Sequence, residues 1–295
     1  MRTAIASLLF SVSAALAQQL CNGYAELCDR KFSNITWLGD HDSPFIGEFL
    51  TDNQALSVAD QLAGGVRFLT GQTHEWLDQG YLWMCHTSCW EEESGLLTTY
   101  LETIGTFLDA NPDEVIFLLL TNGDYVDVSI FGTAFETAGL TDLVFTTTGT
   151  LAMDEWPTLG ELISNGTRLV VFLDYDADVA TVPYILPEFD YFFETAYDVT
   201  AQSDFSSCAL NRPSGSDGTG LMMIVNHFLD VDVLGVDIPD FAEESVTNAA
   251  TGTGSIGAQA AVCLEEWGRL PNGILIDYFK TDDGALTAYK TLNNL

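Results

Sequence analysis

The stretch Trp37-Leu38-Gly39-Asp40-His41-Asp42-Ser43-Pro44 is the part of the sequence from which we predict the fold. It overlaps the apolar run 35–38, which predicts a buried strand, and the glycine, aspartate and proline residues end that strand. His41 therefore lies at the end of a strand, where a loop can hold its imidazole over a cleft. Histidine is the side chain best suited to transfer protons near neutral pH. A single histidine in such a turn is more often structural than catalytic, so a catalytic role needs a second signal.

A second histidine, His86, gives that signal. It follows the apolar run 81–84 and precedes Thr87 and Ser88, so it also lies where a predicted strand ends. Two histidines held in this way could serve as the base and the acid of one reaction.

Strand and helix patterns alternate along the rest of the chain. Continuous apolar runs predict buried strands at 35–38, 66–69, 81–84, 115–120, 169–173, 191–193, 221–225 and 274–276. Helical periodicity predicts helices at 96–110, 128–138, 159–163, 256–267 and 285–292. This alternation predicts an α/β fold with a mainly parallel sheet covered by helices, and such a series fits a single-domain TIM-type (β/α)8 barrel. A doubly wound open sheet is the alternative, but no Gly-x-Gly-x-x-Gly motif follows the first strand.

The first 17 residues have the pattern of a secretory signal peptide. Arg2 gives the positive start, 5–10 the apolar centre and Ala15-Leu16-Ala17 the cleavage site, so we expect a secreted, extracellular mature domain of residues 18–295. No later apolar run is long enough to span a membrane. The sequons at Asn34 and Asn165 predict glycosylation, and Asn165, in a polar turn between a helix and a strand, is the better candidate.

Six cysteines follow the signal segment, which in a secreted chain predicts three disulfides. Their count does not fix the connectivity, but proximity along the chain favours Cys21–Cys28 and Cys85–Cys89, which leaves Cys208–Cys263. The Cys85–Cys89 bridge would stiffen the loop that carries His86. A zinc site is the alternative, and the oxidising secretory route argues against it.

Composition and charge narrow the classes of partner. With 47% hydrophobic residues, one domain can bury a sizeable core. Signal cleavage would remove one of the 9 basic residues and none of the 43 acidic ones, which takes the formal net charge from −34 to −35. Such a surface excludes nucleic acid as a partner and should be repelled by anionic membranes. We expect a monomer without stable membrane insertion that acts on a small-molecule or lipid substrate.

Polar residues follow the predicted strands at many places. In a (β/α)8 barrel such residues line the active site. The candidates are His41, Asp42, Gln72, His74, His86, Asn122, Asp124, Asp174, Glu194, Asn226, His227 and Asp277. Loops are polar in any protein, which accounts for some of these residues but less well for the position of all four histidines.

At several positions the chain resembles a known family. Gly39-Asp40-His41-Asp42-Ser43 resembles the Gly-Thr-His-Asp-Ser signature of the phosphatidylinositol-specific phospholipase C X-domain barrels. Similar motifs lie at 61–62, 65–68, 107–108, 111–115 and 276–279, so the resemblance covers most of the mature chain. The secreted fungal phospholipase C-like phosphodiesterases are the most similar group, through Cys85-His86-Thr87-Ser88-Cys89 and Asn226-His227-Phe228-Leu229-Asp230.

The resemblance implies a role for each of four residues. His41 would be the general base that takes a proton from the attacking hydroxyl, and His86 the general acid that protonates the leaving oxygen. Asp277 would orient His41, as the aspartate of a catalytic triad orients its histidine, and Asp42 would support the same group by hydrogen bonding. The implied function is that of a phosphoric diester hydrolase acting on a lipid phosphodiester or a glycerophosphodiester.

One departure from the family concerns the second strand. Bacterial members carry Asp-x-Arg there, and the arginine binds the phosphoryl oxygens, whereas this chain has Thr70-Gly71-Gln72. Loss of that cation should cost about 3–4 kcal/mol of transition-state stabilisation, by analogy with the loss of an oxyanion donor. The strand also lacks the acidic ligands of calcium-dependent relatives, so the motif requires no cofactor and gives a divalent metal no support. His74 is the candidate replacement, either as a protonated cation or, when neutral, as a metal ligand.

Two function classes stay open at this point. One is a phosphodiesterase whose substrate contacts come from Gln72, His74, Asn122, Asp174, Glu194 and His227. The other is a catalytically silent barrel that serves as an extracellular binding or cell-surface protein, and a glycoside hydrolase is a weaker third option. For an enzyme, the carboxylates beside His41 predict a raised pKa of this histidine and a bell-shaped rate profile centred at about pH 6–7.

Overall fold

The computed structural model describes residues 18–47, 49–233, 236–281 and 284–295, so the predicted signal peptide lies outside the described residues. Eight parallel strands form the main sheet in the order β7-β6-β5-β2-β1-β12-β9-β8. Their bounds are β1 (Trp37–Asp40), β2 (Phe68–Glu75), β5 (Ile116–Asn122), β6 (Leu169–Leu173), β7 (Ile185–Pro187), β8 (Phe192–Glu194), β9 (Met222–Asn226) and β12 (Gly273–Ile276). This order is that of a TIM-type barrel in which, among the described residues, no ladder joins β7 to β8.

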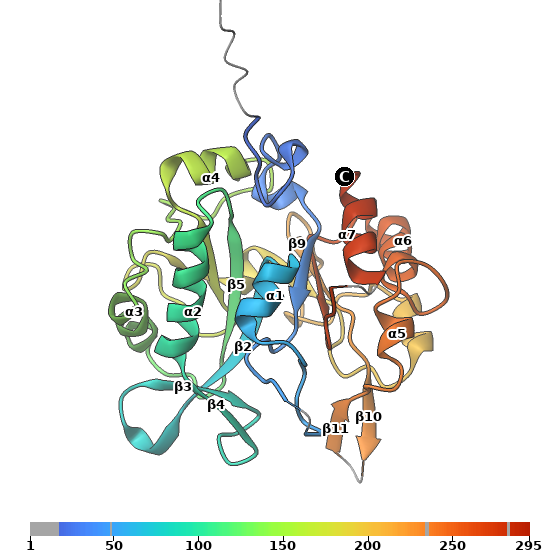
Figure 1. Cartoon of the computed structure of the whole chain (residues 1–295), viewed down its shortest axis with the longest axis horizontal. Helices are drawn as coiled ribbons and strands as arrows, with labels where there is room; N and C mark the ends of the chain where they lie inside the picture. Colours follow the sequence, from blue (N-terminus) through green and yellow to red (C-terminus); the bar gives the residue numbers. More distant parts are fainter. Residues whose placement is uncertain (1–17, 48, 234–235, 282–283) are drawn as a thin grey trace, which may run out of the picture.

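Helices cover the outside of the sheet, with α2 and α3 on one flank and α5, α6 and α7 on the other (Figure 1). Their bounds are α1 (Val58–Gly64), α2 (Leu97–Ala110), α3 (Val128–Thr137), α4 (Leu159–Asn165), α5 (Glu244–Thr247), α6 (Ile256–Trp267) and α7 (Gly284–Asn293). Side-chain caps start several of them: Ser255 accepts a hydrogen bond from the Ala258 amide, and Thr158 forms a reciprocal capping box with Glu161. The helices predicted at 96–110, 128–138, 159–163, 256–267 and 285–292 are confirmed, whereas α1 and α5 were missed.

The run 81–84 is not a barrel strand, which corrects one expectation. It belongs to β3 (Leu82–His86), which pairs antiparallel with the end of β2 and with β4 (Glu92–Leu96). The eighth barrel strand is instead β7, which the sequence analysis missed because it has only three residues and ends in proline. A second antiparallel pair, β10 (Asp230–Val233) and β11 (Val236–Pro239), also projects from the main sheet, and both hairpins lie at the bottom of Figure 1.

The centre of the barrel is packed with phenylalanine rings. Phe68 and Phe117 stack with their ring centroids 3.8 Å apart, and Phe172 and Phe192 contact the ring of Phe117 from other strands. All four side chains are fully buried. Gly39 leaves room for this packing, since a Cβ atom there would lie 2.5 Å from the Phe68 ring. The motif glycine is therefore required by the core beneath the site.

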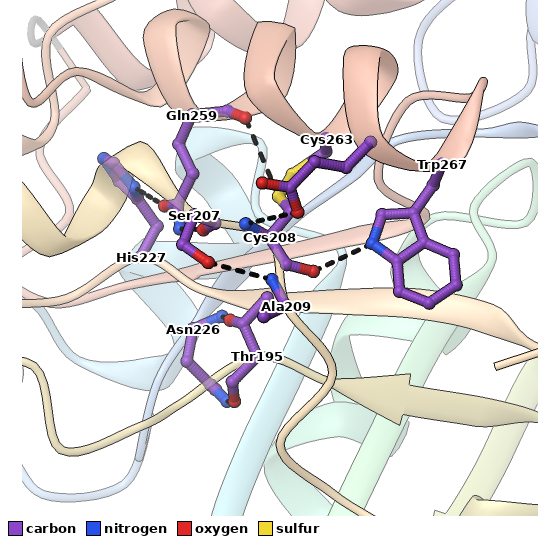
Figure 2. Close-up of a disulfide and its surroundings, with 10 residues drawn as sticks. Thr195, Ser207, Cys208, Ala209, Asn226, His227, Gln259, Cys263 and Trp267 are labelled. Carbon is purple, nitrogen blue, oxygen red and sulfur yellow. Dashed lines mark hydrogen bonds between the residues drawn. A yellow bond between two sulfur atoms is a disulfide. The ribbon is translucent and has the colours of Figure 1, made fainter. Parts of the chain in front are cut away.

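Three disulfides are present, and their pairing confirms the prediction from proximity. The pairs are Cys21–Cys28, Cys85–Cys89 and Cys208–Cys263. The last one ties the loop before β9 to α6 (Figure 2). No cysteine of the described residues is free, so none is left as a thiolate ligand for zinc. Within the described ranges no helix has the length and apolar character needed to cross a membrane.

Candidate active site

His41 and His86 meet at one carboxylate. The Nε2 atom of each ring lies 3.4 Å from Oδ2 of Asp42. His41 follows β1 at the carboxyl edge of the barrel, whereas His86 ends β3, which runs back toward that edge because it is antiparallel to β2. The two histidines thus reach the same site from opposite directions.

A second carboxylate lies behind His41. Oδ1 of Asp277, which follows β12, is 3.0 Å from Nδ1 of His41. Asn53 donates from Nδ2 to both oxygens of Asp277, at 3.2 and 3.3 Å, and so fixes the carboxylate. The ring of Phe228 stacks on the imidazole at a centroid distance of 3.7 Å. These contacts hold His41 in one orientation with Nε2 directed toward Asp42.

The protonated form of His41 is strongly favoured. Burial alone would lower the pKa of His41, but the charges of Asp42 and Asp277 outweigh burial and raise this pKa to about 9. The pKa of His41 is raised, as the sequence analysis expected. The size of the shift is larger than expected and moves the acidic limb of any rate profile well above the predicted window of pH 6–7.

Gln72, which the sequence analysis matched to the family arginine, makes internal hydrogen bonds. Its Nε2 donates to Oδ2 of Asp42 at 2.7 Å, and its Oε1 accepts from the Thr87 amide at 3.0 Å. Gln72 therefore connects Asp42 to the loop of His86, which the Cys85–Cys89 disulfide closes. The Gln72 amide positions both Asp42 and the His86 loop, but it supplies no positive charge.

A cleft with two compartments opens beside the histidines. The arginine compartment has a volume of about 230 Å³ and is lined by His41, Asp42, Gln72, Glu194, Tyr197 and Arg212, among others. The aspartate compartment has a volume of about 200 Å³ and is lined by His41, His86, Asn53, Asp198, Asp230 and Asp237, among others. His41 lines both compartments, so a molecule bound across the cleft would contact it.

Arg212 is a cation in the lining of the cleft, and the sequence analysis missed it. Its Nε donates to Oε2 of Glu194 at 3.0 Å, its Nη2 donates to the same oxygen, and its guanidinium lies 4.6 Å from the ring centroid of Tyr197. The Nδ2 of Asn226 donates to Oε2 of Glu194 at 3.2 Å and supports the pair. No local motif marks Arg212, because it lies in a loop well after β8 and only the fold brings it into the same compartment as Asp42.

Four residues predicted to bind substrate lie outside the lining of both compartments. His74 lies where β2 extends beyond the barrel to pair with β3, and its Nδ1 is 2.9 Å from Oδ1 of Asp124. His227 is fully buried between Gln259 and the Thr247 carbonyl, and Figure 2 shows its ring beside Gln259. The structure therefore does not place His74 as a substitute for the family arginine or His227 at the substrate.

Asn122 and Asp174 are the other two residues of this group. Asn122 donates to the Val126 and Tyr175 carbonyls, and Asp174 accepts from the amides of Asn122 and Tyr175. Both residues are buried and hold the turns that follow β5 and β6. Polar residues at strand ends serve such turns as readily as they serve substrates. Glu194 does line the cleft, as predicted, but its carboxylate is engaged by Arg212.

The described residues contain no group of three or more histidine, cysteine, aspartate or glutamate side chains arranged to hold a metal ion. Among the carboxylates beside the histidines and Arg212, Asp277 pairs with His41, Glu194 pairs with Arg212 and Asp42 accepts from the amide of Gln72. The chemistry that this arrangement supports is general acid and base catalysis by two imidazoles, one of them backed by a buried carboxylate.

Comparison with known proteins gives close sequence relatives. One is "PI-PLC X domain-containing protein 1" of Arthroderma benhamiae, which is 44% identical over 292 residues, 99% of this chain and 95% of the relative. An "Uncharacterized secreted protein" of the same fungus is 40% identical over 268 residues, 88% of this chain and 60% of that protein.

Solved bacterial structures share the fold at low sequence identity. Phosphatidylinositol-specific phospholipase C of Listeria monocytogenes has a TM-score of 0.59 and 17% identity, with 95% of this chain and 97% of that chain covered. The enzyme of Staphylococcus aureus has a TM-score of 0.64 and 15% identity, with 94% and 99% covered. The family profile described as "PI-PLC X 1" matches residues 27–293, which is most of the sequence. The chain belongs to the phosphatidylinositol-specific phospholipase C X-domain family.

Proposed function

We propose that this protein is a secreted phosphodiesterase that cleaves a phosphodiester with His41 as general base and His86 as general acid. The observation that carries the proposal is the convergence of both Nε2 atoms on Asp42, with Asp277 behind His41. The fold and family of known phosphodiesterases support it. The three disulfides, the signal-like first 17 residues and a relative named as secreted support the extracellular location.

The proposed reaction uses each imidazole once. His41 takes the proton of the attacking hydroxyl, from the substrate itself or from water, while the hydroxyl oxygen forms a bond to phosphorus. The bond from phosphorus to the leaving oxygen breaks, and His86 donates its proton to that oxygen. Asp277 stabilises the imidazolium that forms on His41, as the triad aspartate does in hydrolases.

Arg212 is our candidate for the positive charge that faces the phosphoryl oxygens. It is the one arginine or lysine in the described lining of the cleft, and it shares the arginine compartment with His41 and Asp42. Glu194 and Tyr197 hold its guanidinium in place before substrate binds. Phosphoryl transfer depends mainly on such preorganised charge. Arg212 would therefore do from a later loop what the family arginine does from the second strand.

The acidic lining of the aspartate compartment restricts the charge of the alcohol group that a substrate can carry. Asp198, Asp230 and Asp237 line it, and no arginine or lysine does among the described residues. Burial and the charge of Asp277 raise the pKa of Asp230 to about 7, so further negative charge is disfavoured there. We expect a neutral or cationic alcohol to be accepted and an additionally phosphorylated one to be rejected.

The experiment is a hydrolysis assay of purified protein against phosphatidylinositol, phosphatidylethanolamine and soluble glycerophosphodiesters, with and without divalent metal. The proposal predicts metal-independent turnover of at least one of them, lost in both His41→Ala and His86→Ala. His74→Ala is the matched control, because it removes a histidine outside the cleft lining, and it should keep full activity. No turnover of any substrate would favour the silent binding protein, and turnover that survives in His41→Ala would refute the mechanism.

A further inference from the structure

A cavity of about 510 Å³ lies at the other end of the barrel. Thr36 and Asn272, which line it, precede β1 and β12, whereas His41 and Asp277 follow the same two strands. Other walls come from Met153 and from the loop 269–271 between α6 and β12. The cavity is completed by the segment before β1 and by the end of α7. Both of these lie at the top of Figure 1, away from the β3–β4 and β10–β11 hairpins. This amino-end cavity has more than twice the volume of either catalytic compartment.

The charge of the amino-end cavity is opposite to that of the protein. The chain has 43 acidic and 9 basic residues, yet two arginines and no aspartate or glutamate are found among the described residues that line this cavity. The polar groups of the lining include Arg30, Asn34, Arg269, Asn272, Asn293 and Asn294. In a protein of net charge −34, this wall of guanidinium and amide groups creates a local region of positive electrostatic potential.

Neither arginine has an acidic partner within the described part of the chain. The Nη1 of Arg269 donates to Oδ1 of Asn272 at 2.9 Å, and its Nη2 donates to the Leu221 carbonyl. The Nη2 of Arg30 donates to the Asn293 carbonyl at 2.6 Å. The described ion pairs of arginine and lysine involve Arg67, Arg212 and Lys280 instead. Neutral acceptors position the two guanidinium groups and leave their charges uncompensated.

Partial burial makes this arrangement costly for Arg269. Burial lowers the pKa of Arg269, and no carboxylate lies close enough to oppose the shift. A half-buried cation without a partner is stabilised by an anion that replaces lost hydration. Guanidinium groups match the oxygens of phosphate and sulfate groups geometrically, and they keep donors beyond the bonds already made.

We propose that the amino-end cavity binds the oxyanion of a phosphate or sulfate ester between Arg30 and Arg269. The apolar side chains of Ile35, Leu270 and Leu292, which also line the cavity, would contact the organic part of that ester. The volume of the cavity exceeds that of a bare oxyanion. The proposal is independent of the catalytic function, because none of these residues lines the catalytic cleft.

The test measures thermal unfolding and amide NMR shifts with millimolar inorganic phosphate or sulfate against chloride at constant ionic strength. Asn34 begins a sequon and lines the cavity, so the protein is first treated with endoglycosidase. We expect phosphate and sulfate to raise Tm and to shift the amide resonances of Arg269, Leu270 and Asn272 and of residues 293–294. Arg269→Gln and Arg30→Gln should each lose the increase in Tm, and Arg269→Lys should keep part of it.

Two control variants locate the binding. Lys290→Gln removes one positive charge from α7 without changing the cavity lining, and Arg212→Gln removes the cation of the catalytic cleft. Both should keep the phosphate-induced increase in Tm. The proposal is overturned if the unmutated protein shows no increase in Tm, if Arg269→Gln keeps it in full, or if Arg212→Gln alone abolishes it. If Arg269→Gln does not fold, Arg30→Gln and the NMR shifts of the unmutated protein decide the question.

Discussion

Replacement of Asp277 by asparagine tests the electrostatic basis of the site. The change keeps the size of a side chain that is 6% exposed and removes the charge that lies 3.0 Å from Nδ1 of His41. The free protein holds the pKa of His41 at about 9 instead of 6.5. At about 1.4 kcal/mol per pKa unit, this difference corresponds to roughly 3 kcal/mol in favour of the charged imidazole.

Three carboxylates, those of Asp42, Asp277 and Asp230, share that effect. Asp277 lies nearer to His41 than Asp42 does and is hydrogen-bonded to it. Its loss should remove at least about one third of the effect, so the pKa of His41 should fall by about one unit or more, or about 1.4 kcal/mol. Burial of the imidazole remains in the variant and acts in the same direction. The acidic limb of the kcat/KM profile should move down with the pKa of His41.

The assay is an NMR titration of the His41 ring proton in the unmutated protein and in Asp277→Asn, with assignment from His41→Gln. Asp124→Asn is the control, because it makes the same change beside His74, outside the cleft lining. The reasoning is refuted if the pKa of His41 stays at about 9 in Asp277→Asn or falls equally in Asp124→Asn.

Stability gives a second readout of the same pair. Because the pKa of His41 is raised on folding, the stabilisation is fully present below the unfolded pKa of about 6.5 and is lost as pH rises through about 9. The free energy of unfolding of the unmutated protein should therefore fall across this range. In Asp277→Asn the decline attributable to His41 should be smaller and lie at lower pH.

Three further predictions concern charge, loop closure and the core. Arg212→Gln should lower kcat/KM by about 10²–10³, with partial retention in Arg212→Lys, as measured on the substrate found active. Replacement of both Cys85 and Cys89 by serine should lower kcat by up to about 10² with little change in far-UV circular dichroism, because the His86 loop loses its position. Phe68→Ala should reduce the free energy of unfolding in urea by about 3–5 kcal/mol, since the ring is fully buried in the phenylalanine cluster.

Local patterns along the sequence predicted most of the barrel. Apolar runs bounded by glycine, proline and aspartate correspond to β1, β5, β6 and β9, and helical periodicity corresponds to α2, α3 and α6. The sequence patterns gave wrong or no predictions for strands whose place depends on the strand they pair with. β3 has the apolar character of a barrel strand but pairs antiparallel with an extension of β2, and β7 is too short to show any pattern.

The candidate site shows the same limit. His41, His86, Asp42 and Asp277 were named from strand ends and from the family resemblance, and the structure brings them together. Asn53 and Arg212 lie in loops without a motif, so only the folded chain places them beside the histidines. Conversely, strand-end position alone could not distinguish a cleft residue from His227, whose ring serves the packing of α6.

The assignment of acid and base is tested most directly by the leaving group. We would compare hydrolysis of an alkyl phosphodiester and its p-nitrophenyl analogue by the unmutated protein, His86→Ala and His41→Ala. A nitrophenolate leaves without protonation, so His86→Ala should lose the alkyl substrate but retain most of its rate on the p-nitrophenyl analogue, whereas His41→Ala should lose both. Equal losses on the two substrates in His86→Ala would contradict its role as the general acid and, with it, the proposed mechanism.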